Sequence, residues 1–236
     1  MAILRVGVAF PDPPFNGIAD GGLDIDLINA VATAMGMTVA LVAYDGSDFN
    51  GIFDELGSGL YDCVIAGTTV TPERQRMAAF APPYLISGQS LAVDTERLPK
   101  VRSVDDLAGL TIGVQQGNTS QPVAEHLVAA GKAAAVRVYD YGSIRTALTD
   151  LSTGGCDAFM KLAPVLSELV GPLVGVEVVQ RNISREDIAI AVALADDAML
   201  QCIATAQAEL EDDGTLQGIR RKWLGNPYID QSLAAH

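Results

Sequence analysis

The residues of this chain best suited to hold a ligand are a glycine, hydroxyls and a guanidinium that directly follow an apolar run. Residues 62–66 are mostly apolar and predict a short buried strand. Gly67 comes next and permits a close approach of the backbone to another group. Thr71 and Pro72 are typical of a helix start, as its cap and its first residue. The pattern therefore places polar groups where a buried strand ends.

Together these groups predict a cradle for a carboxylate. The hydroxyl of Thr69 is a hydrogen-bond donor, and the planar guanidinium of Arg74 matches a carboxylate with two parallel N–H groups. A helix start also favours an anion. The alternative is an ordinary capped helix with a surface arginine, which would hold no ligand.

The composition excludes several classes of protein. A chain of 236 residues with 49% hydrophobic content is not disordered and can form one large or two medium domains. Its net charge of −14 disfavours nucleic acid as a partner. Cys63, Cys156 and Cys202 lack metal-ligand spacing, and His126 and His236 are the only histidines, so we expect neither a metal nor a cofactor. No apolar run reaches the roughly 20 residues of a membrane helix.

Strand-like runs alternate with helical ones, which predicts an α/β chain with largely parallel sheets. The predicted strands cover residues 4–9, 38–43, 63–67, 90–93, 111–115, 136–139, 158–161, 176–180 and 188–192. The predicted helices cover residues 24–35, 51–56, 72–77, 103–107, 122–130, 143–151, 163–169, 197–211 and 215–223.

Two parts of the chain resemble each other. Residues 4–8 match residues 110–114, and a helix end, a glycine turn and an aspartate recur at 56–62 and 151–157. The repeat predicts two related α/β lobes, with chance similarity of generic units as the alternative. Two lobes imply a cleft, into which each contributes a polar turn that follows a strand. We expect these turns to hold an anionic group from both sides.

The chain resembles a family 3 solute-binding protein, the amino-acid-capturing component of ABC importers. Segments similar to those of the family occur in the family's order over nearly the whole length: residues 13–15, 22–27, 48–51, 66–74, 80–84, 87–89, 106–109, 113–119 and 222–225. Each segment is a weak signal, but their joint order and spacing form a strong one.

The resemblance implies a bilobed periplasmic-binding-protein fold, with two doubly wound α/β lobes joined by two hinge strands. Lobe 1 would comprise residues 1–88 plus 187–236, and lobe 2 residues 89–186. The lobes would close over the ligand by a hinge motion, and the closed form would dock on the importer's permease. The implied protein is a monomer, periplasmic or extracellular, whose signal segment is not part of these residues, and an intracellular origin is the alternative.

The resemblance also implies roles for individual residues. Arg74 would pair with the ligand's α-carboxylate, helped by Gly67, Thr69 and Thr119, while Phe49 would cover the ligand. Phe49 as plain core is the alternative. The predicted ligand-binding residues are Asp12, Phe15, Phe49, Ala66, Gly67, Thr69, Arg74, Gln115, Thr119 and Lys161.

One position departs from the family. An aspartate that neutralises the ligand's ammonium usually follows the second-lobe strand, and here this position is Leu162, preceded by Lys161. A buried ammonium without a counter-charge is costly, so the change should affect what is bound. Asp12 would be a substitute partner, or the ligand lacks an α-amine and Lys161 pairs with a second carboxylate or a keto group. The third explanation is a shifted register or a solvent-facing Lys161.

Two rival functions are relevant. Some relatives are cyclohexadienyl dehydratases, which need an acid in the helix after the second-lobe strand. Residues 163–165 contain none, and Glu168 falls a turn too far, so we do not expect an enzyme. The same fold also serves as a ligand-sensing receptor domain, which would continue into a membrane segment.

Overall fold

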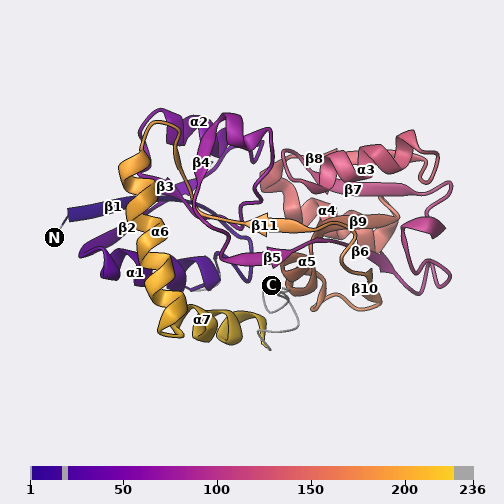
Figure 1. Cartoon of the computed structure of the whole chain (residues 1–236). Coiled ribbons are helices and arrows are strands. Elements are labelled where there is room, and N and C mark those ends of the chain that lie inside the picture. The colour runs from indigo at the N-terminus through magenta and orange to yellow at the C-terminus, as the bar shows by residue number, and fades with distance from the viewer. Residues whose placement is uncertain (1, 18–20, 226–236) are drawn as a thin grey trace. The chain divides into compact units, whose positions relative to one another are not determined.

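The computed structural model describes residues 2–17 and 21–225 and divides the chain into two compact units. Unit 1 comprises Met1–Asp45, Asn50–Ile86 and Glu186–His236, and unit 2 comprises Gly46–Phe49 and Ser87–Arg185. Each unit contains a five-stranded sheet and its own helices (Figure 1). The predicted α/β fold with two lobes is therefore confirmed.

The sheet of unit 1 has the order β2-β1-β3-β12-β4. Strand β1 (Ala2–Ala9) runs parallel to β2 (Met37–Tyr44) and to β3 (Cys63–Val64). Strand β12 (Ala191–Ala193) is antiparallel to both β3 and β4 (Ala78–Phe80). The sheet is thus mixed, whereas the sequence predicted a largely parallel one.

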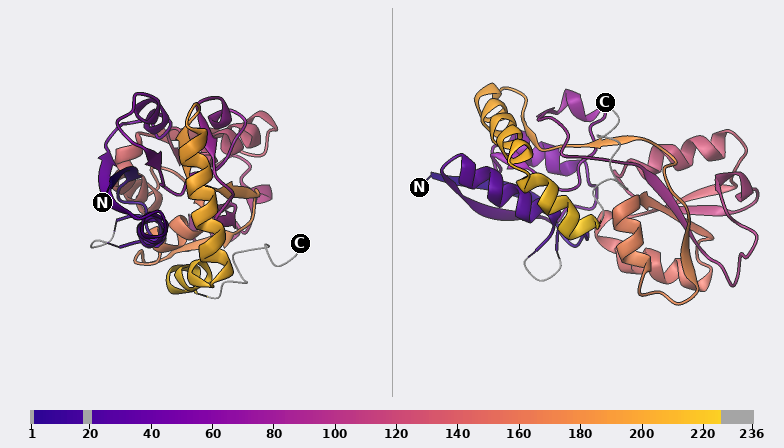
Figure 2. Two further views of the ribbon diagram at one scale, coloured as in Figure 1. Left: turned by 60° about the vertical axis from the view of Figure 1, so that its left-hand side comes forward. Right: turned by 60° about the horizontal axis from the view of Figure 1, so that its bottom comes forward.

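The described residues of unit 1 form four α-helices. Helix α1 (Leu23–Ala34) connects β1 to β2, and α2 (Gly51–Gly57) leads into β3. Figure 1 shows these two helices on opposite sides of the sheet, as right-handed crossovers in opposite directions require. Helices α6 (Asp197–Asp212) and α7 (Thr215–Leu224) pack against α1, and Figure 2 shows α7 leaving the C-terminal end of α6 at an angle.

The buried residues of α1 explain its orientation. Leu23, Leu27, Ile28 and Val31 are fully buried, and their spacing of three and four residues puts them on one side of the helix. Asp24 and Asp26 lie in its first turn, where negative charge is favourable. An apolar stripe therefore fixes the helix on the sheet.

The sheet of unit 2 has the order β10-β6-β9-β7-β8. Strand β7 (Thr111–Gln115) is parallel to β8 (Ala135–Tyr139) and β9 (Ala158–Leu162). Strand β6 (Gln89–Asp94) is antiparallel to β9 and to β10 (Val176–Gln180). The C-terminal ends of the parallel strands β7 and β9 therefore lie side by side.

Helices cover both faces of this second sheet. Leu91 and Val93 pack with α3 (Ser120–Ala129), whereas Ala92, between them, packs with α4 (Ile144–Thr153) and α5 (Ala163–Val170). The alternation follows from the two-residue period of a strand. Unit 2 also contains short 3₁₀ turns, η2 (Val104–Asp106) and η3 (Tyr141–Ser143).

The chain passes between the units at Ile86/Ser87 and at Arg185/Glu186. Strands β5 (Leu85–Ser87) and β11 (Glu186–Ile188) pair there in a separate two-stranded sheet. The lobe bounds expected from the sequence, 88/89 and 186/187, fall within two residues of these points. Gly46–Phe49 also belongs to unit 2, which the sequence did not suggest.

Some predicted elements are wrong in length or type. The helix expected over residues 72–77 is one 3₁₀ turn, η1 (Arg74–Arg76), and the strand expected over 63–67 ends at Val64. The strand expected over 188–192 is interrupted between β11 and β12. Within residues 2–17 and 21–225, no helix has both the length and the apolar character required to span a bilayer.

Candidate ligand-binding site

Arg74 is held in a defined orientation within unit 1. Its side chain is buried, with 4% of the residue exposed. Nε donates to Asn50 Oδ1 (3.1 Å), Nη1 donates to the Thr69 carbonyl oxygen (3.0 Å), and the guanidinium lies 5.5 Å from the centre of the Phe53 ring. Burial of a guanidinium is costly unless it is hydrogen-bonded, and these contacts compensate for that cost and fix the orientation of the side chain.

The short 3₁₀ turn η1 stands where the sequence predicted a helix whose N-terminus would attract an anion. The amide of Arg74 donates to Thr71 Oγ1 (3.1 Å), although the residue at the cap position of this turn is Glu73 and not Thr71 as the sequence predicted. A turn of three residues has no appreciable macrodipole, so the predicted contribution of a helix N-terminus is wrong. The guanidinium itself has to supply the attraction for a carboxylate.

Thr69 links Arg74 to an acidic side chain that the sequence did not single out. The Thr69 hydroxyl donates to Glu186 Oε2 (2.6 Å), and both residues are buried. Glu186 begins β11 and stands in a charged run, Arg185-Glu186-Asp187, that is typical of a solvated turn. The sequence separates these two residues by 117 positions, so only the fold reveals the contact.

Gly67 and Phe15 meet at the turn after β3. Gly67 has a positive φ of 56°, and a Cβ atom placed there would lie 3.0 Å from Phe15 Cδ2. Phe15 is fully buried and packs under this turn, and Ala66 beside it is 1% exposed. The turn therefore requires the glycine both for its backbone conformation and for space.

The Gly67 turn is also tied to a buried carboxylate. Asp24 Oδ2 accepts hydrogen bonds from the Gly67 amide (2.7 Å) and from Asn16 Nδ2 (3.0 Å), and Oδ1 accepts from the Tyr84 hydroxyl (2.6 Å). Burial, together with a smaller effect of the nearby negative charge of Asp12, raises the pKa of Asp24 to about 7 despite these bonds. Asp12 itself is buried and shares backbone hydrogen bonds with Asn16.

We expect the stability contribution of Asp24 to fall as the pH rises. Because its pKa is raised from 3.8 to about 7, the folded state binds more protons than the unfolded state between these values. Each pH unit there should lower the contribution by at most about 1.4 kcal/mol. Urea unfolding of wild type and Asp24→Asn from pH 4.5 to 7.5 measures this as a growing deficit of wild type relative to the variant.

The exposed Asp212, changed to Asn, is the matched control and should leave the pH profile of wild type unaltered. Parallel profiles for wild type and Asp24→Asn would contradict the expected titration.

A second prediction concerns Gly67. Gly67→Ala should lower the free energy of unfolding by about 2–3 kcal/mol, because it combines backbone strain with the contact to Phe15. Gly36 also has a positive φ, 69°, but open space around its Cβ position. Gly36→Ala should therefore cost only the strain, about 1 kcal/mol. Thermal unfolding compares the two, and equal losses would show that the Phe15 contact has no effect.

Within unit 2, Lys161 and Gln115 are neighbours at the ends of the parallel strands β9 and β7. Lys161 Nζ donates to Gln115 Oε1 (2.8 Å), and Gln115 Nε2 donates to the Tyr141 carbonyl oxygen. Nζ also lies 5.8 Å from the centre of the Tyr141 ring. Lys161 is 4% exposed, so the explanation that it faces solvent is wrong.

Phe49 belongs to the segment that is grouped with unit 2. Its ring lies 5.3 Å from that of Tyr141, its amide donates to the Gln116 carbonyl oxygen (3.2 Å), and the Ser47 carbonyl oxygen accepts from the Tyr141 amide (2.7 Å). Phe49 is therefore packed beside Tyr141, the residue that also contacts Lys161.

Thr119 lies on unit 2 at the start of α3. Its hydroxyl accepts a hydrogen bond from Gln89 Nε2 (3.1 Å), and Gln89 pairs in the sheet with Leu162. Leu162 is 8% exposed and ends β9. Gln89 is a further polar residue near Thr119 that the sequence did not indicate.

The structure thus gathers the predicted site residues into two sets. The set in unit 1 comprises Asp12, Phe15, Ala66, Gly67, Thr69 and Arg74, and the set in unit 2 comprises Phe49, Gln115, Thr119 and Lys161. Among the described residues, no three or more His, Cys, Asp or Glu side chains are placed to hold a metal ion.

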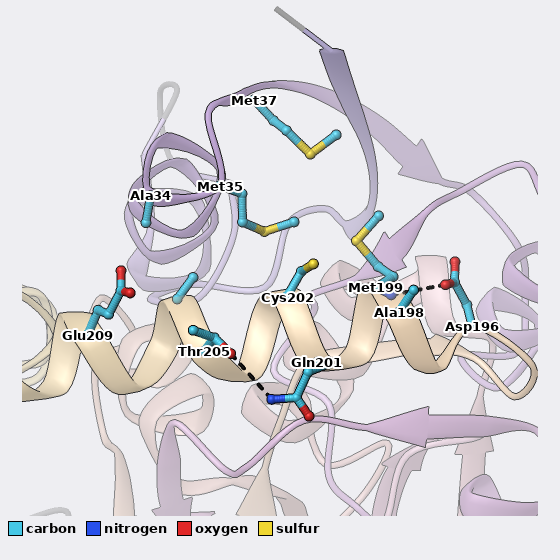
Figure 3. A pocket seen from close by; sticks show the side chains of 11 residues that line it. Ala34, Met35, Met37, Asp196, Ala198, Met199, Gln201, Cys202, Thr205 and Glu209 are labelled. Atoms are coloured by element: carbon cyan, nitrogen blue, oxygen red, sulfur yellow. Dashed lines mark hydrogen bonds between the residues drawn. The ribbon is translucent and has the colours of Figure 1, made fainter.

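A separate pocket of about 500 Å³ opens on unit 1 between α6 and the connection from α1 to β2. Figure 3 shows the side chains of Met35, Met199 and Cys202 converging on it. None of its lining residues is a predicted ligand-binding residue. Cys202 is exposed, whereas Cys63 and Cys156 are buried, and burial raises the pKa of both of these thiols.

Comparison with known proteins connects this geometry to one family. The family model described as bacterial extracellular solute-binding proteins, family 3, matches residues 4–226. The ABC transporter arginine-binding protein 1 of Escherichia coli (strain K12) is 28% identical over 230 residues, covering 94% of this chain and 90% of the relative. The L-cystine-binding protein TcyJ of the same strain is 28% identical over 236 residues, covering 94% and 82%.

Solved structures give the same result. An ancestral arginine-binding protein bound to arginine has a TM-score of 0.86 at 33% identity and covers 95% of this chain and 99% of its own. An ancestral arginine-binding protein bound to glutamine reaches 0.85 at 34% identity, covering 96% and 99%. An ancestral amino acid-binding protein, a precursor of cyclohexadienyl dehydratase, reaches 0.83 at 29% identity, covering 94% and 95%.

Proposed function

The chain belongs to the bacterial extracellular solute-binding proteins of family 3, and on this basis we propose that it captures an amino acid, or a close analogue with a carboxylate, for an ABC importer. The observation that carries the proposal is the buried guanidinium of Arg74, which Asn50 and Thr69 hold in a fixed orientation. A planar guanidinium in a protein interior is well suited to a carboxylate, which it binds through two parallel hydrogen bonds.

The named ligands of similar proteins support an amino acid. Arginine, cystine and glutamine appear in the names of these relatives and structures, and their side chains differ in charge and size. The groups they share are the α-carboxylate and the α-ammonium. A conserved chemistry for these two groups with a variable side-chain pocket would account for all of them.

We propose that the chain forms the two lobes predicted from its sequence, and that ligand binding closes them by a hinge motion. The β5–β11 pair is the natural hinge, because the chain passes between the units there. Phe49, Gln115, Thr119 and Lys161 would contribute to the ligand from unit 2. In this proposed role, the protein acts as a monomer outside the cytoplasm and delivers its ligand to a permease.

We propose no catalytic role. A dehydratase would need a general acid at the ligand, and Glu168, the acidic residue of α5, is exposed. The similar precursor of cyclohexadienyl dehydratase is itself named an amino acid-binding protein.

Thermal unfolding in the presence of each of the standard L-amino acids and L-cystine tests the proposal. A ligand present at 100 times its Kd should raise the free energy of unfolding by about 2.7 kcal/mol. We expect one or a few members of the panel to stabilise the protein in this way. The proposal fails if neither these compounds nor the corresponding amine-free 2-oxo and 2-hydroxy acids stabilise it.

A further inference from the structure

Glu186 is a buried carboxylate beside the proposed carboxylate-binding residues. It is 6% exposed, and its Oε2 accepts the Thr69 hydroxyl hydrogen bond at 2.6 Å. A short O–H···O contact to an ionised carboxylate is among the stronger hydrogen bonds in proteins. Glu186 is therefore firmly attached to the residue that also orients Arg74.

The backbone fixes this arrangement. Thr69 forms an isolated bridge with Ile188, the Val70 amide donates to the Asp187 carbonyl oxygen (2.8 Å), and the Ala189 amide donates to the Thr68 carbonyl oxygen (3.0 Å). The loop after β3 thus lies along β11 through several backbone contacts. The position of the Glu186 carboxylate relative to Thr69 follows from the fold and not only from the two side chains.

Thr69 therefore connects the guanidinium of Arg74 to the carboxylate of Glu186. The carbonyl oxygen of Thr69 accepts from Arg74 Nη1, while its hydroxyl donates to Glu186. An α-amino acid presents the complementary pattern, because its carboxylate and its ammonium are bonded to the same carbon atom. A ligand whose carboxylate meets Arg74 would have its ammonium on the neighbouring side, where Glu186 lies.

The family resemblance implies an acid for the ligand's ammonium at the position of Leu162, so another acid is needed here if the ligand is a zwitterion. We propose, on the basis of the proposed function, that the carboxylate of Glu186 binds the α-ammonium group of the ligand. The ligand is then a zwitterionic amino acid. Asp12, the candidate suggested by the sequence, is the alternative acid, and its negative charge acts on Asp24.

The proposal also gives Lys161 a different role from the one considered in the sequence. Its ammonium is bonded to Gln115 and lies near the Tyr141 ring, so it has a structural place within unit 2. A ligand with a second carboxylate is then not required to explain this lysine. Binding of a dicarboxylic acid in place of an amino acid would show that such a ligand is bound after all.

The test compares each amino acid that stabilises the wild type with the 2-hydroxy acid that has the same side chain. L-Arginine and L-glutamine with their 2-hydroxy counterparts are the first two probe pairs. Calorimetry of wild type should show clear preference for the amino acid. Glu186→Gln, which can still accept the Thr69 hydrogen bond, should weaken the amino acid by at least about 30-fold and leave the 2-hydroxy acid within about threefold.

Two further variants control for structural effects. Glu177→Gln makes the same chemical change at an exposed position of β10 and should bind both probes as wild type does. Glu186→Asp keeps the charge and should retain most of the preference for the amine. If Glu186→Gln proves unstable, Glu186→Asp decides the question, because the side chain is shorter by one methylene and should weaken the amino acid measurably more than the 2-hydroxy acid, whereas equal changes for both probes would overturn the proposal.

The possible failures are distinct. Equal weakening of both members of a pair in Glu186→Gln, or no weakening of either, would overturn the role of Glu186. Binding of 2-oxo, 2-hydroxy or dicarboxylic acids by wild type without binding of any amino acid would overturn it too, while carboxylate capture by Arg74 would stand. If neither class of compound binds to wild type, the proposed function and the role of Glu186 are both wrong.

Discussion

Arg74→Ala should reduce the affinity for the captured amino acid by at least about 100-fold, because each charge-assisted hydrogen bond to a carboxylate contributes about 1.5–3 kcal/mol. Arg74→Lys should recover only part of the affinity. A lysine cannot make two parallel bonds to a carboxylate, and it cannot at the same time hold Asn50 and the Thr69 carbonyl oxygen as the guanidinium does. Isothermal titration calorimetry with the strongest ligand of the amino-acid panel measures both losses.

Arg76 provides the matched control for this experiment. It lies in the same 3₁₀ turn, two residues further on, and carries the same charge, but it is exposed. Arg76→Ala should therefore bind like wild type, which would separate the effect of the buried guanidinium from a general loss of positive charge. Affinity of Arg74→Ala within threefold of wild type, with an unchanged far-ultraviolet circular dichroism spectrum, would contradict the proposed function.

Arg220→Ala should lower the free energy of unfolding by about 2–4 kcal/mol. Arg220 is 2% exposed, its Nε donates to the Tyr84 carbonyl oxygen (2.7 Å), and its Nη1 donates to both carboxylate oxygens of Glu211 (2.8 Å each). Removal of the guanidinium leaves a cavity and a carbonyl oxygen without this partner. Glu211 is 41% exposed, so water compensates for part of the loss at that end.

Urea unfolding of Arg220→Ala and of Arg221→Ala tests this account. Arg221 is the next residue of α7 and is exposed, so its replacement should change the free energy of unfolding by less than about 0.5 kcal/mol. Similar losses in both variants would mean that the contacts with Tyr84 and Glu211 do not stabilise the fold.

Local patterns predicted most of the regular elements. The alternation of buried Leu4 and Val6 with exposed Arg5 in β1 and the apolar stripe of α1 reflect contacts that recur every two, three or four residues, which a sequence displays directly. The short strand β4 is different. Its three residues become a strand because they pair with β12, more than 100 residues away, and no local pattern records that pairing.

The same distinction applies to the candidate site. Arg74 and Thr69 stand close together in a recognisable segment, so the sequence could suggest a carboxylate site there. Glu186 depends on the contact of β11 with the loop after β3, and the bond between Lys161 and Gln115 depends on the register of β7 and β9. The pairing of segments that are far apart in the sequence therefore decides which charged side chains lie next to each other. Here it brings a buried acid to the site that the sequence alone had not identified.

The distribution of the cysteines makes site-specific labelling straightforward. Cys63 and Cys156 are buried, and their raised pKa values keep them protonated and unreactive at neutral pH, whereas Cys202 is exposed on α6. A maleimide dye added to the unmodified protein should therefore attach at one place, in unit 1. One cysteine introduced on the surface of unit 2 would complete a donor–acceptor pair, so that the proposed hinge motion could be followed as a change in energy transfer between the two dyes on one molecule.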